Sequence, residues 1–218
     1  MPFDYEALSD LISAGSIDFI IAADAGLVHL ESLEIEPDLI VGDFDSLGYV
    51  PEGPEVVLHP VHKDESDLEL ALEEAAARKF DSAIVCGALG GRLDHTIAAL
   101  HACARFAEAG TDIALIGDDA LVKILVGPRT YRLPNIIEGT VSVFSAVDES
   151  RGVSEYGMEY PLEDATLGNR TSLGLSNELI GQPASVSVEK GTLYIIHPIP
   201  QSRDLDVISH VISACRVT

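Results

Sequence analysis

The first half of the chain alternates short apolar runs with helical patterns, and this alternation limits the fold more than any other feature. The pattern predicts strands at residues 19–23, 39–41, 56–59, 83–86 and 113–116, and helices at 5–12, 27–33, 68–78 and 96–109. Alternating strands and helices form a mainly parallel sheet with helices packed on it. Ligands of such sheets collect beyond the carboxyl ends of the strands, so polar residues that directly follow a strand are candidate site residues.

The pattern changes near Gly117. Beyond it, short β-prone runs at residues 122–126, 140–146, 184–188 and 193–197 are separated by Gly, Pro and Asn, which is typical of a small antiparallel β-sandwich. We therefore expect an α/β protein with a mainly parallel α/β domain over residues 1–120 and a smaller antiparallel β-sandwich domain over 121–200. A tail, residues 201–218, carries apolar residues at helical spacing and is expected to form a short packed helix.

Two carboxylates, Asp43 and Asp45, follow the predicted strand 39–41 and flank one apolar residue, Phe44. Side chains two apart in an extended chain point the same way, so both can converge on one cation if the strand continues through Phe44. Oxygen ligands with no His or Cys nearby favour a hard ion such as Mg²⁺, which is usually held by carboxylates and substrate phosphates. This predicts a phosphate-handling enzyme. The alternative is a simple turn, which Asp and Ser after Gly42 would also suit.

A second cluster, Lys63-Asp64-Glu65-Ser66-Asp67, precedes the predicted helix 68–78. Ser66 and Glu69 fit a capping box, and Asp67 falls in the first turn, where the helix dipole favours an anion. A cap alone does not explain Asp64 beside Lys63. An acid and a base next to a helix end therefore favour a functional role here.

A glycine-rich segment lies between the predicted strand 83–86 and the helix that follows it. Gly87, Gly90 and Gly91 allow backbone N–H groups to approach an anion, and the helix N-terminus favours negative charge. Arg92 adds a planar fork for phosphate. The spacing matches neither the dinucleotide-binding pattern nor a P-loop. The alternative, a tight turn with Asp94 as a helix cap, leaves Arg92 unexplained.

In this order the motifs resemble those of the thiamine pyrophosphokinase family. Five blocks carry the resemblance: Asp24-Ala25-Gly26, Gly42 to Ser46, Lys63 to Asp67, Gly87 to His95, and Thr171 to Glu178. The resemblance as a whole spans roughly residues 18–197, and the ordered combination is far more specific than any single block. The family commonly has a second Gly where Ala25 stands and often Thr where Ser66 stands.

The resemblance implies transfer of pyrophosphate from ATP to the hydroxyl of thiamine, with release of AMP. It implies that residues 1–120 form the ATP-binding catalytic domain and that the sandwich, residues 121–200, binds thiamine. It also implies a homodimer with thiamine bound between domains of different subunits. The implied Mg²⁺ ligands are Asp43, Asp45 and Asp67. The implied ATP-binding residues are Asp24, Gly26, Lys63, Ser66, Gly87, Gly90, Gly91, Arg92 and His95. The implied thiamine-binding residues are Ser172, Ser176 and Asn177. The expected catalytic residues are Asp43, Asp45, Asp67, Asp64, Arg92 and Asp94, and the residue that takes the hydroxyl proton stays open among Asp64, Asp67 and Asp94.

The charge of the chain excludes some partners. Thirteen Lys and Arg stand against 36 Asp and Glu, a formal net charge of −23, which argues against nucleic acid because that partner needs clustered basic residues. ATP must then bind through Mg²⁺ and a few local cations, for which Lys63 and Arg92 are placed. No apolar run is long enough to cross a membrane, no targeting signal is evident, and three widely spaced cysteines suggest reduced thiols. We therefore expect a cytoplasmic protein with no membrane partner.

Two alternatives to this function remain at the level of the sequence. One is a pyrophosphokinase for another primary alcohol, such as a hydroxymethylpterin. The other is a non-catalytic sensor of thiamine or a nucleotide, against which the intact carboxylates argue, since a sensor could lose them without losing its ligand pocket.

Overall fold

The computed structural model describes residues 12, 17–45, 48–53, 55–60, 65–134 and 136–199 of the 218-residue chain. The predicted helix 5–12, except its last residue, and the predicted tail helix lie outside these residues. The chain divides into two compact units between Phe80 and Asp81, whereas the predicted domain boundary at residue 120 falls inside the second unit. None of the helices in the described ranges has the length and apolar character needed to span a membrane.

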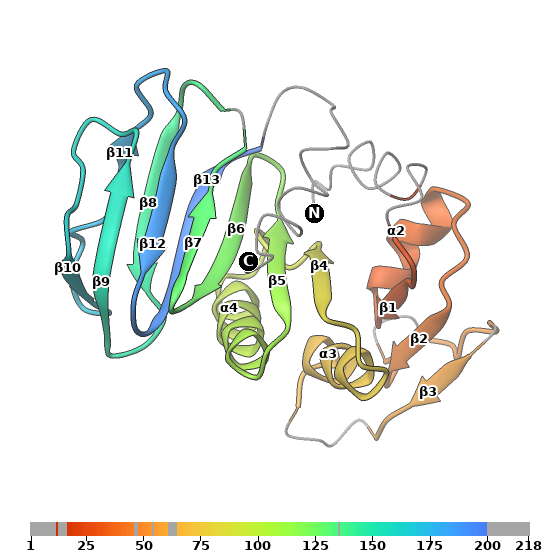
Figure 1. The fold of residues 1–218 in the computed structure, drawn as a ribbon. Coiled ribbons are helices and arrows are strands. Elements are labelled where there is room, and N and C mark those ends of the chain that lie inside the picture. The colour runs from red at the N-terminus through yellow and green to blue at the C-terminus, as the bar shows by residue number, and fades with distance from the viewer. Residues whose placement is uncertain are drawn as a thin grey trace. The chain divides into compact units, whose positions relative to one another are not determined.

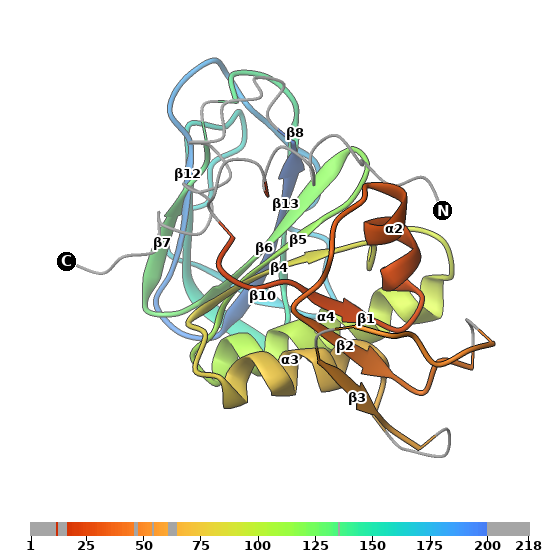
Figure 2. The same ribbon diagram turned by 90° about the vertical axis from the view of Figure 1, so that its right-hand side faces the viewer.

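The first unit is a three-stranded parallel sheet with helices on both faces. Its elements are β1 (Ile21–Ala23), α2 (Gly26–Ser32), β2 (Leu39–Gly42), β3 (Val56–Leu58) and α3 (Asp67–Ala77), and the strand order is β1-β2-β3 (Figure 1). Ile40 packs with Leu27 and Leu30 of α2, whereas Leu39 packs with Leu70 of α3. Because neighbouring residues of a strand face opposite sides, α2 and α3 cover opposite faces of this sheet (Figure 2).

Helix α3 begins as the sequence predicts. Ser66 is its N-cap, and its Oγ accepts a hydrogen bond from the Glu69 N–H at 3.3 Å. The Glu69 carboxylate accepts the Ser66 N–H at 3.0 Å in return. The predicted capping box is therefore confirmed, and it satisfies two of the N–H groups that a helix start leaves without partners.

The second unit is a β-sandwich that carries one parallel strand pair at its edge. Its elements are β4 (Ser82–Cys86), α4 (Leu93–Glu108), β5 (Asp112–Ile116), β6 (Ala120–Val126), β7 (Arg129–Arg132), β8 (Thr140–Ser145), β9 (Glu149–Tyr156), β10 (Ala165–Gly168), β11 (Asn177–Glu178), β12 (Ser185–Val188) and β13 (Thr192–Pro198). A six-stranded sheet has the order β11-β8-β13-β6-β5-β4, and a four-stranded antiparallel sheet has the order β10-β9-β12-β7. One buried core joins them, with Val143 and Ile195 from the first sheet and Tyr131 and Val186 from the second.

The fold class is thus the predicted one, but the parallel strands are distributed differently. The sequence predicted one mainly parallel sheet, whereas β4 and β5 pair in parallel with each other in the six-stranded sheet and β1 to β3 form a separate sheet. A tight turn follows β5, where the Gly117 N–H donates to the Ala120 carbonyl at 2.9 Å. This turn returns the chain as the antiparallel strand β6, so the α/β segment continues directly into the sandwich.

Four strands were not predicted from the sequence: β7, β9, β10 and β11. Strand β9 has the sequence Glu-Ser-Arg-Gly-Val-Ser-Glu-Tyr, with Val153 as its one aliphatic residue beyond glycine. Its buried positions include Ser150 and Glu155, so polar residues stand where an alternating pattern would show apolar ones.

Candidate functional site

Three carboxylates gather at the carboxyl ends of β1 and β2. Carboxylate oxygens of Asp24, Asp43 and Asp45, here called the acidic triad, all lie within 4.8 Å of one another. Asp24 directly follows β1 and Asp43 directly follows β2, and these strands are parallel neighbours, so their ends meet at the same edge of the sheet. The fold thereby brings Asp24, which the sequence associated with ATP, together with two of the predicted Mg²⁺ ligands.

The turn from Asp43 to Asp45 is not the extended segment that the sequence analysis assumed. Strand β2 ends at Gly42, and Phe44 has φ +59°, in the left-handed region that is uncommon for non-glycine residues. The Phe44 ring is buried in the core of the first unit, and the Asp45 N–H donates to Asp43 Oδ1 at 3.1 Å. The two carboxylates therefore converge through a turn anchored by a buried ring. The condition that the strand continues through Phe44 is not met, and convergence does not require it.

Asp24 is held in an unusual environment. It has φ +43°, is only 9% exposed, and its Oδ1 is buried with no hydrogen-bond partner among the described residues. Its backbone N–H donates to the Val41 carbonyl at 2.8 Å. Residue 42 must be small, because a Cβ there would lie 3.2 Å from Asp24 Cα. Left-handed non-glycine residues cost about 1–3 kcal/mol each and concentrate at ligand sites, and a buried carboxylate oxygen without a partner is similarly unfavourable.

The acidic triad fits a hard divalent cation. Its ligand atoms are all oxygens, the donor set that Mg²⁺ and Ca²⁺ prefer. Two ionised carboxylates 4.8 Å apart repel each other by about 3.5 kcal/mol at an effective dielectric constant of about 20. A bound cation would replace this repulsion by attraction and would give Asp24 Oδ1 a partner.

The other predicted residues of the first unit lie at helix starts. Asp67 is the first residue of α3 and is not among the three carboxylates of the acidic triad, and Ser66 uses its Oγ in the helix cap. Gly26 is the first residue of α2, and a Cβ there would meet nothing within 4 Å, which leaves space beside the backbone. Lys63 and Asp64 lie outside the described residues.

The glycine segment of the second unit forms the predicted strand, turn and helix. Gly87, Gly90 and Gly91 have φ values of +73°, +85° and +68°, which glycine adopts without strain. Helix α4 starts at Leu93, and its N-cap residue, Arg92, makes no side-chain capping bond. Gly90 and Gly91 are exposed, and of the N–H groups at the start of α4 one, that of His95, is bonded to the Asp94 side chain. The glycine turn and the helix start therefore offer a place for an anion.

Arg92 is paired with Asp94 through a two-pronged ion pair. Arg92 Nε donates to Asp94 Oδ1 at 3.1 Å and Arg92 Nη2 donates to Asp94 Oδ2 at 2.6 Å. Chiefly through these hydrogen bonds, Arg92 lowers the pKa of Asp94 to about 2. Asp94 also accepts the N–H of His95, which is exposed in the first turn of α4. Because the pair is solvent-exposed and such pairs contribute little to stability, a phosphate group can take the place of Asp94 on the guanidinium.

The predicted thiamine-binding residues lie at the free edge of the six-stranded sheet. Ser172 and Ser176 are exposed, and the Ser176 N–H donates to Ser142 Oγ at 3.1 Å. Asn177, the first residue of β11, is only 5% exposed and uses its amide inside the protein. Its main partner is Glu155 of β9, a buried carboxyl group that the sequence analysis missed because β9 itself was not predicted.

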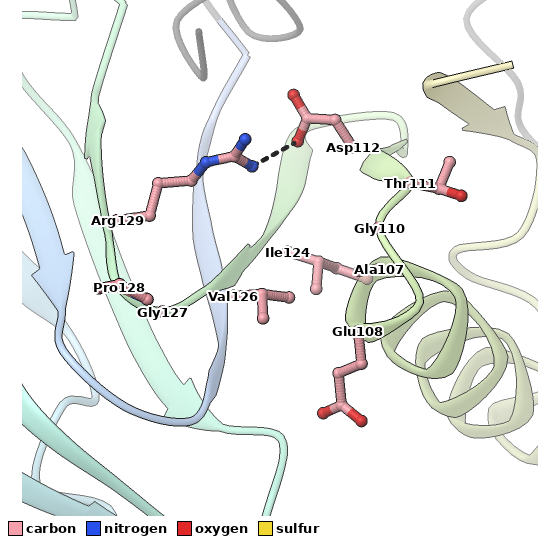
Figure 3. A pocket seen from close by; sticks show the side chains of 10 residues that line it. All are labelled: Ala107, Glu108, Gly110, Thr111, Asp112, Ile124, Val126, Gly127, Pro128 and Arg129. Atoms are coloured by element: carbon pink, nitrogen blue, oxygen red, sulfur yellow. Dashed lines mark ion pairs between the residues drawn. The ribbon is translucent and has the colours of Figure 1, made fainter. Parts of the chain in front are cut away.

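A cavity of about 290 Å³ lies in the second unit between the end of α4, the turn that follows it, β6 and Arg129 (Figure 3). Its polar wall includes Asp112, whose Oδ1 accepts a hydrogen bond from the fully buried Lys123 at 2.5 Å and lies 3.7 Å from Arg129. The cavity lining includes none of the predicted site residues.

The two units show the features of one class of protein. Carboxylates that follow parallel strands and a glycine turn that leads into a helix are typical of α/β enzymes that bind phosphate groups with the help of a divalent cation.

Comparison with known proteins names the family. The model of the catalytic domain of thiamin pyrophosphokinase matches residues 13–115, and the model of its vitamin B1 binding domain matches residues 130–193, together well over half of the chain. This chain therefore belongs to the thiamine pyrophosphokinase family, a family of transferases, as the resemblance of its motifs predicted.

Individual relatives agree with this assignment. The thiamine pyrophosphokinase of Bacillus subtilis is 28% identical over 185 residues, which cover 81% of this chain and 85% of that protein. A crystal structure of thiamine pyrophosphokinase from Bacillus subtilis superposes with a TM-score of 0.74 at 27% identity and covers 87% of this chain and 92% of that one. Thiamin pyrophosphokinase from Candida albicans shares the fold at 16% identity, with a TM-score of 0.68 over 85% of this chain and 84% of that one.

Proposed function

We propose that this protein transfers pyrophosphate from ATP to the hydroxyl group of thiamine and releases thiamine diphosphate and AMP. The observation that carries the proposal is the acidic triad: three carboxylates within 4.8 Å, one with a buried oxygen that lacks a partner among the described residues, in the segment that matches the catalytic-domain model. The name of the Bacillus subtilis relative supports thiamine as the acceptor.

Mg²⁺ is the proposed metal, held by Asp24, Asp43 and Asp45. When bound, the ion neutralises charge on the triphosphate and polarises the phosphorus that is attacked. The role of the protein is to hold its carboxylates in place before the substrate arrives, and the buried Phe44 ring and the close approach of Asp24 to Gly42 do so. Asp67, the first residue of α3, is retained as a proposed further residue of the metal site, to which its carboxylate would add negative charge.

The phosphates of ATP are assigned to the glycine turn and to the start of α4. The N–H groups of Gly90 and Gly91, together with Arg92, supply donors for phosphate oxygens, and His95 adds a polar ring in the first helical turn. Ser66, Gly26 and Lys63 are proposed to complete the nucleotide contacts. Positioning and electrostatic stabilisation then supply most of the acceleration, because transfer of this kind requires little covalent chemistry from the protein.

The proton of the thiamine hydroxyl needs an acceptor, and Asp94 is the weakest of the three candidates. A general base works best when its pKa lies near the working pH, whereas the pKa of Asp94 is lowered to about 2 by its bonds to Arg92. We therefore propose that Asp94 orients Arg92 and that the proton goes to Asp64 or Asp67.

The exposed Ser172 and Ser176 are proposed to contact thiamine, and we propose that two chains associate to complete this site. Large apolar side chains near these serines support association: Tyr160 is 67% exposed, Leu173 is 59% exposed and Leu175 is 53% exposed. Apolar groups gathered in one surface region favour contact with a partner. A cytoplasmic location is part of the same proposal.

The identity of the nucleotide product tests the function. The purified protein with ATP, Mg²⁺ and thiamine should form AMP and thiamine diphosphate in equal amounts, measured by anion-exchange chromatography. Formation of ADP with thiamine monophosphate would show an ordinary kinase and refute the proposal. Turnover of a hydroxymethylpterin but not of thiamine would show that the enzyme acts on that other primary alcohol. Binding of thiamine without any turnover would identify a sensor.

A further inference from the structure

Asn177 has no hydrogen-bonding capacity left for a ligand. Its Nδ2 donates to Glu155 Oε2 at 2.6 Å and to the Tyr160 carbonyl at 2.8 Å. Its Oδ1 accepts the N–H groups of Tyr160 and Glu178, both at 3.0 Å. A primary amide offers two donors and two acceptor positions, so all four are used within the chain. The amide therefore acts on the protein rather than on a substrate.

The bonds of Asn177 hold two surface segments together. They bind both the N–H and the carbonyl of Tyr160, and they also bind the N–H of Glu178, the second residue of β11. Ser176, directly before Asn177, is kept at φ +58° and bonded through its N–H to Ser142. The Asn177 amide thus anchors the end of the exposed segment that contains Ser172 and Ser176, here called the 171–178 segment.

Glu155 ties that amide to β9. The backbone groups of Tyr160 and Glu178 fix which way the amide faces, because an N–H only donates and a carbonyl only accepts. Nδ2 therefore faces Glu155, and the 2.6 Å hydrogen bond between them joins the amide to β9. Glu155 is 1% exposed, and its other oxygen, Oε1, is buried without a partner in the described part of the chain. Burial raises the pKa of this carboxyl group, and the hydrogen bond from Asn177 opposes the shift. A carboxyl group in such a place is unfavourable for stability, which points to a role other than packing.

We propose that Glu155 is a positioning residue for the thiamine-binding segment and acts through Asn177. The inference rests on the proposed function, because thiamine is the ligand assigned to the 171–178 segment. Glu155 anchors the Asn177 amide to β9, the amide ties Tyr160 to the start of β11, and the segment before β11 is thereby held where its serine hydroxyls meet the substrate. Glu155 itself does not touch thiamine in this arrangement.

Three variants separate positioning from simple stability. Glu155→Leu removes the acceptor and leaves the Asn177 Nδ2 without its partner. Glu155→Gln keeps an acceptor oxygen of nearly the same size. Val153→Ala is the matched control, because Val153 lies two residues away on the same face of β9 and is fully buried in the core but makes no bond to Asn177.

The kinetic readout is the Michaelis constant for thiamine. Glu155→Leu should raise it roughly tenfold or more, the effect of losing about one charge-assisted hydrogen bond, while the constant for ATP stays within about twofold. Glu155→Gln should restore most of the loss. Val153→Ala should lower the melting temperature without changing either constant. Asn177→Ala removes the same hydrogen bond from its other end and should also raise the constant for thiamine. Adding Glu155→Leu to Asn177→Ala should raise it little further, because the bond between the two residues is already absent.

Hydrogen exchange provides a readout that does not depend on catalysis. Glu155→Leu should speed amide exchange in the 171–178 segment and at Tyr160 but not in the neighbouring strand β12, and Glu155→Gln should not. If the protein proves inert toward thiamine while exchange changes in this way, the proposed function fails and the positioning role stands. An unchanged thiamine constant in an active Glu155→Leu protein, or exchange that rises equally in Val153→Ala, would overturn the inference.

Discussion

The buried histidine of β13 should make the stability of the protein depend on pH in a predictable way. His197 is 1% exposed. Its Nδ1 lies 2.8 Å from the Pro198 carbonyl, and a carbonyl only accepts, so Nδ1 carries the proton. Nε2 is then the acceptor for the Tyr131 hydroxyl, 2.9 Å away. Both ring nitrogens are satisfied in the neutral form, and protonation of Nε2 would break the bond from Tyr131.

The magnitude follows from the pKa of this group. Burial lowers the pKa of His197 from 6.5 to about 4. Between pH 6.5 and about 4 the imidazole of His197 binds a proton in the unfolded chain but not in the folded chain. The contribution of neutral His197 to the free energy of unfolding is therefore complete above pH 6.5 and is lost as the pH falls to about 4. At about 1.36 kcal/mol per pH unit, the expected loss is about 3 kcal/mol in the free energy of unfolding.

Urea unfolding at a series of pH values between 7.5 and 4 measures this loss. Many carboxylates also titrate at the lower end, so the informative quantity is the difference between the unmodified protein and His197→Gln. That variant should be less stable at neutral pH, and its curve should be flatter between pH 6.5 and 4.5. His101→Gln, at an exposed position of α4, serves as the control and should follow the unmodified protein. If His197→Gln and the unmodified protein lose stability in parallel over this window, burial of a neutral imidazole is not the cause and the reasoning is refuted.

Three further predictions concern the acidic triad, Arg92 and the helix cap. Asp24→Asn and Asp43→Asn should each lower turnover at least about a hundredfold. The melting temperature without metal should stay the same or rise, because repulsion between like charges is relieved, and Mg²⁺ with ATP should no longer raise it in thermal scans. Arg92→Ala should lower kcat/KM for ATP about 10- to 100-fold in steady-state assays, as expected for a charge-assisted contact of about 1.5–3 kcal/mol, with little change in melting temperature because its ion pair with Asp94 is exposed. Ser66→Ala removes the cap of α3 and should lower the free energy of unfolding in urea by about 1 kcal/mol.

Each of these predictions has a result that contradicts it. Near-normal turnover in both aspartate variants would reduce the acidic triad to a structural turn, and Glu52→Gln, at an exposed position of the same unit, controls for loss of charge alone. A large fall in melting temperature in Arg92→Ala would show a structural role for the pair with Asp94. Unchanged stability in Ser66→Ala would show that the capping bonds are exchanged for water without loss.

The sequence by itself determined the features that depend on near neighbours. The capping box of Ser66 and Glu69 joins residues three apart, and the glycines before α4 indicate a turn that needs positive φ. The cap and the turn could therefore be predicted without knowledge of any residue elsewhere in the chain. The helices and most strands were found for the same reason, since the spacing of apolar residues reports which face is buried. The ordered motifs also sufficed to indicate the family, which the family models then confirmed.

Only the tertiary structure decided the features that depend on distant partners. Asp24 lies beside Asp43 because β1 and β2 are parallel neighbours in register. Phe44 has a left-handed backbone conformation, and its ring packs in the core of the first unit. The hydrogen bond between Asn177 and Glu155, 22 residues earlier in the chain, could not be predicted from the sequence. A hydrogen bond between strands depends on sheet order and register, and these are set by the packing of the whole unit rather than by the residues beside the bond.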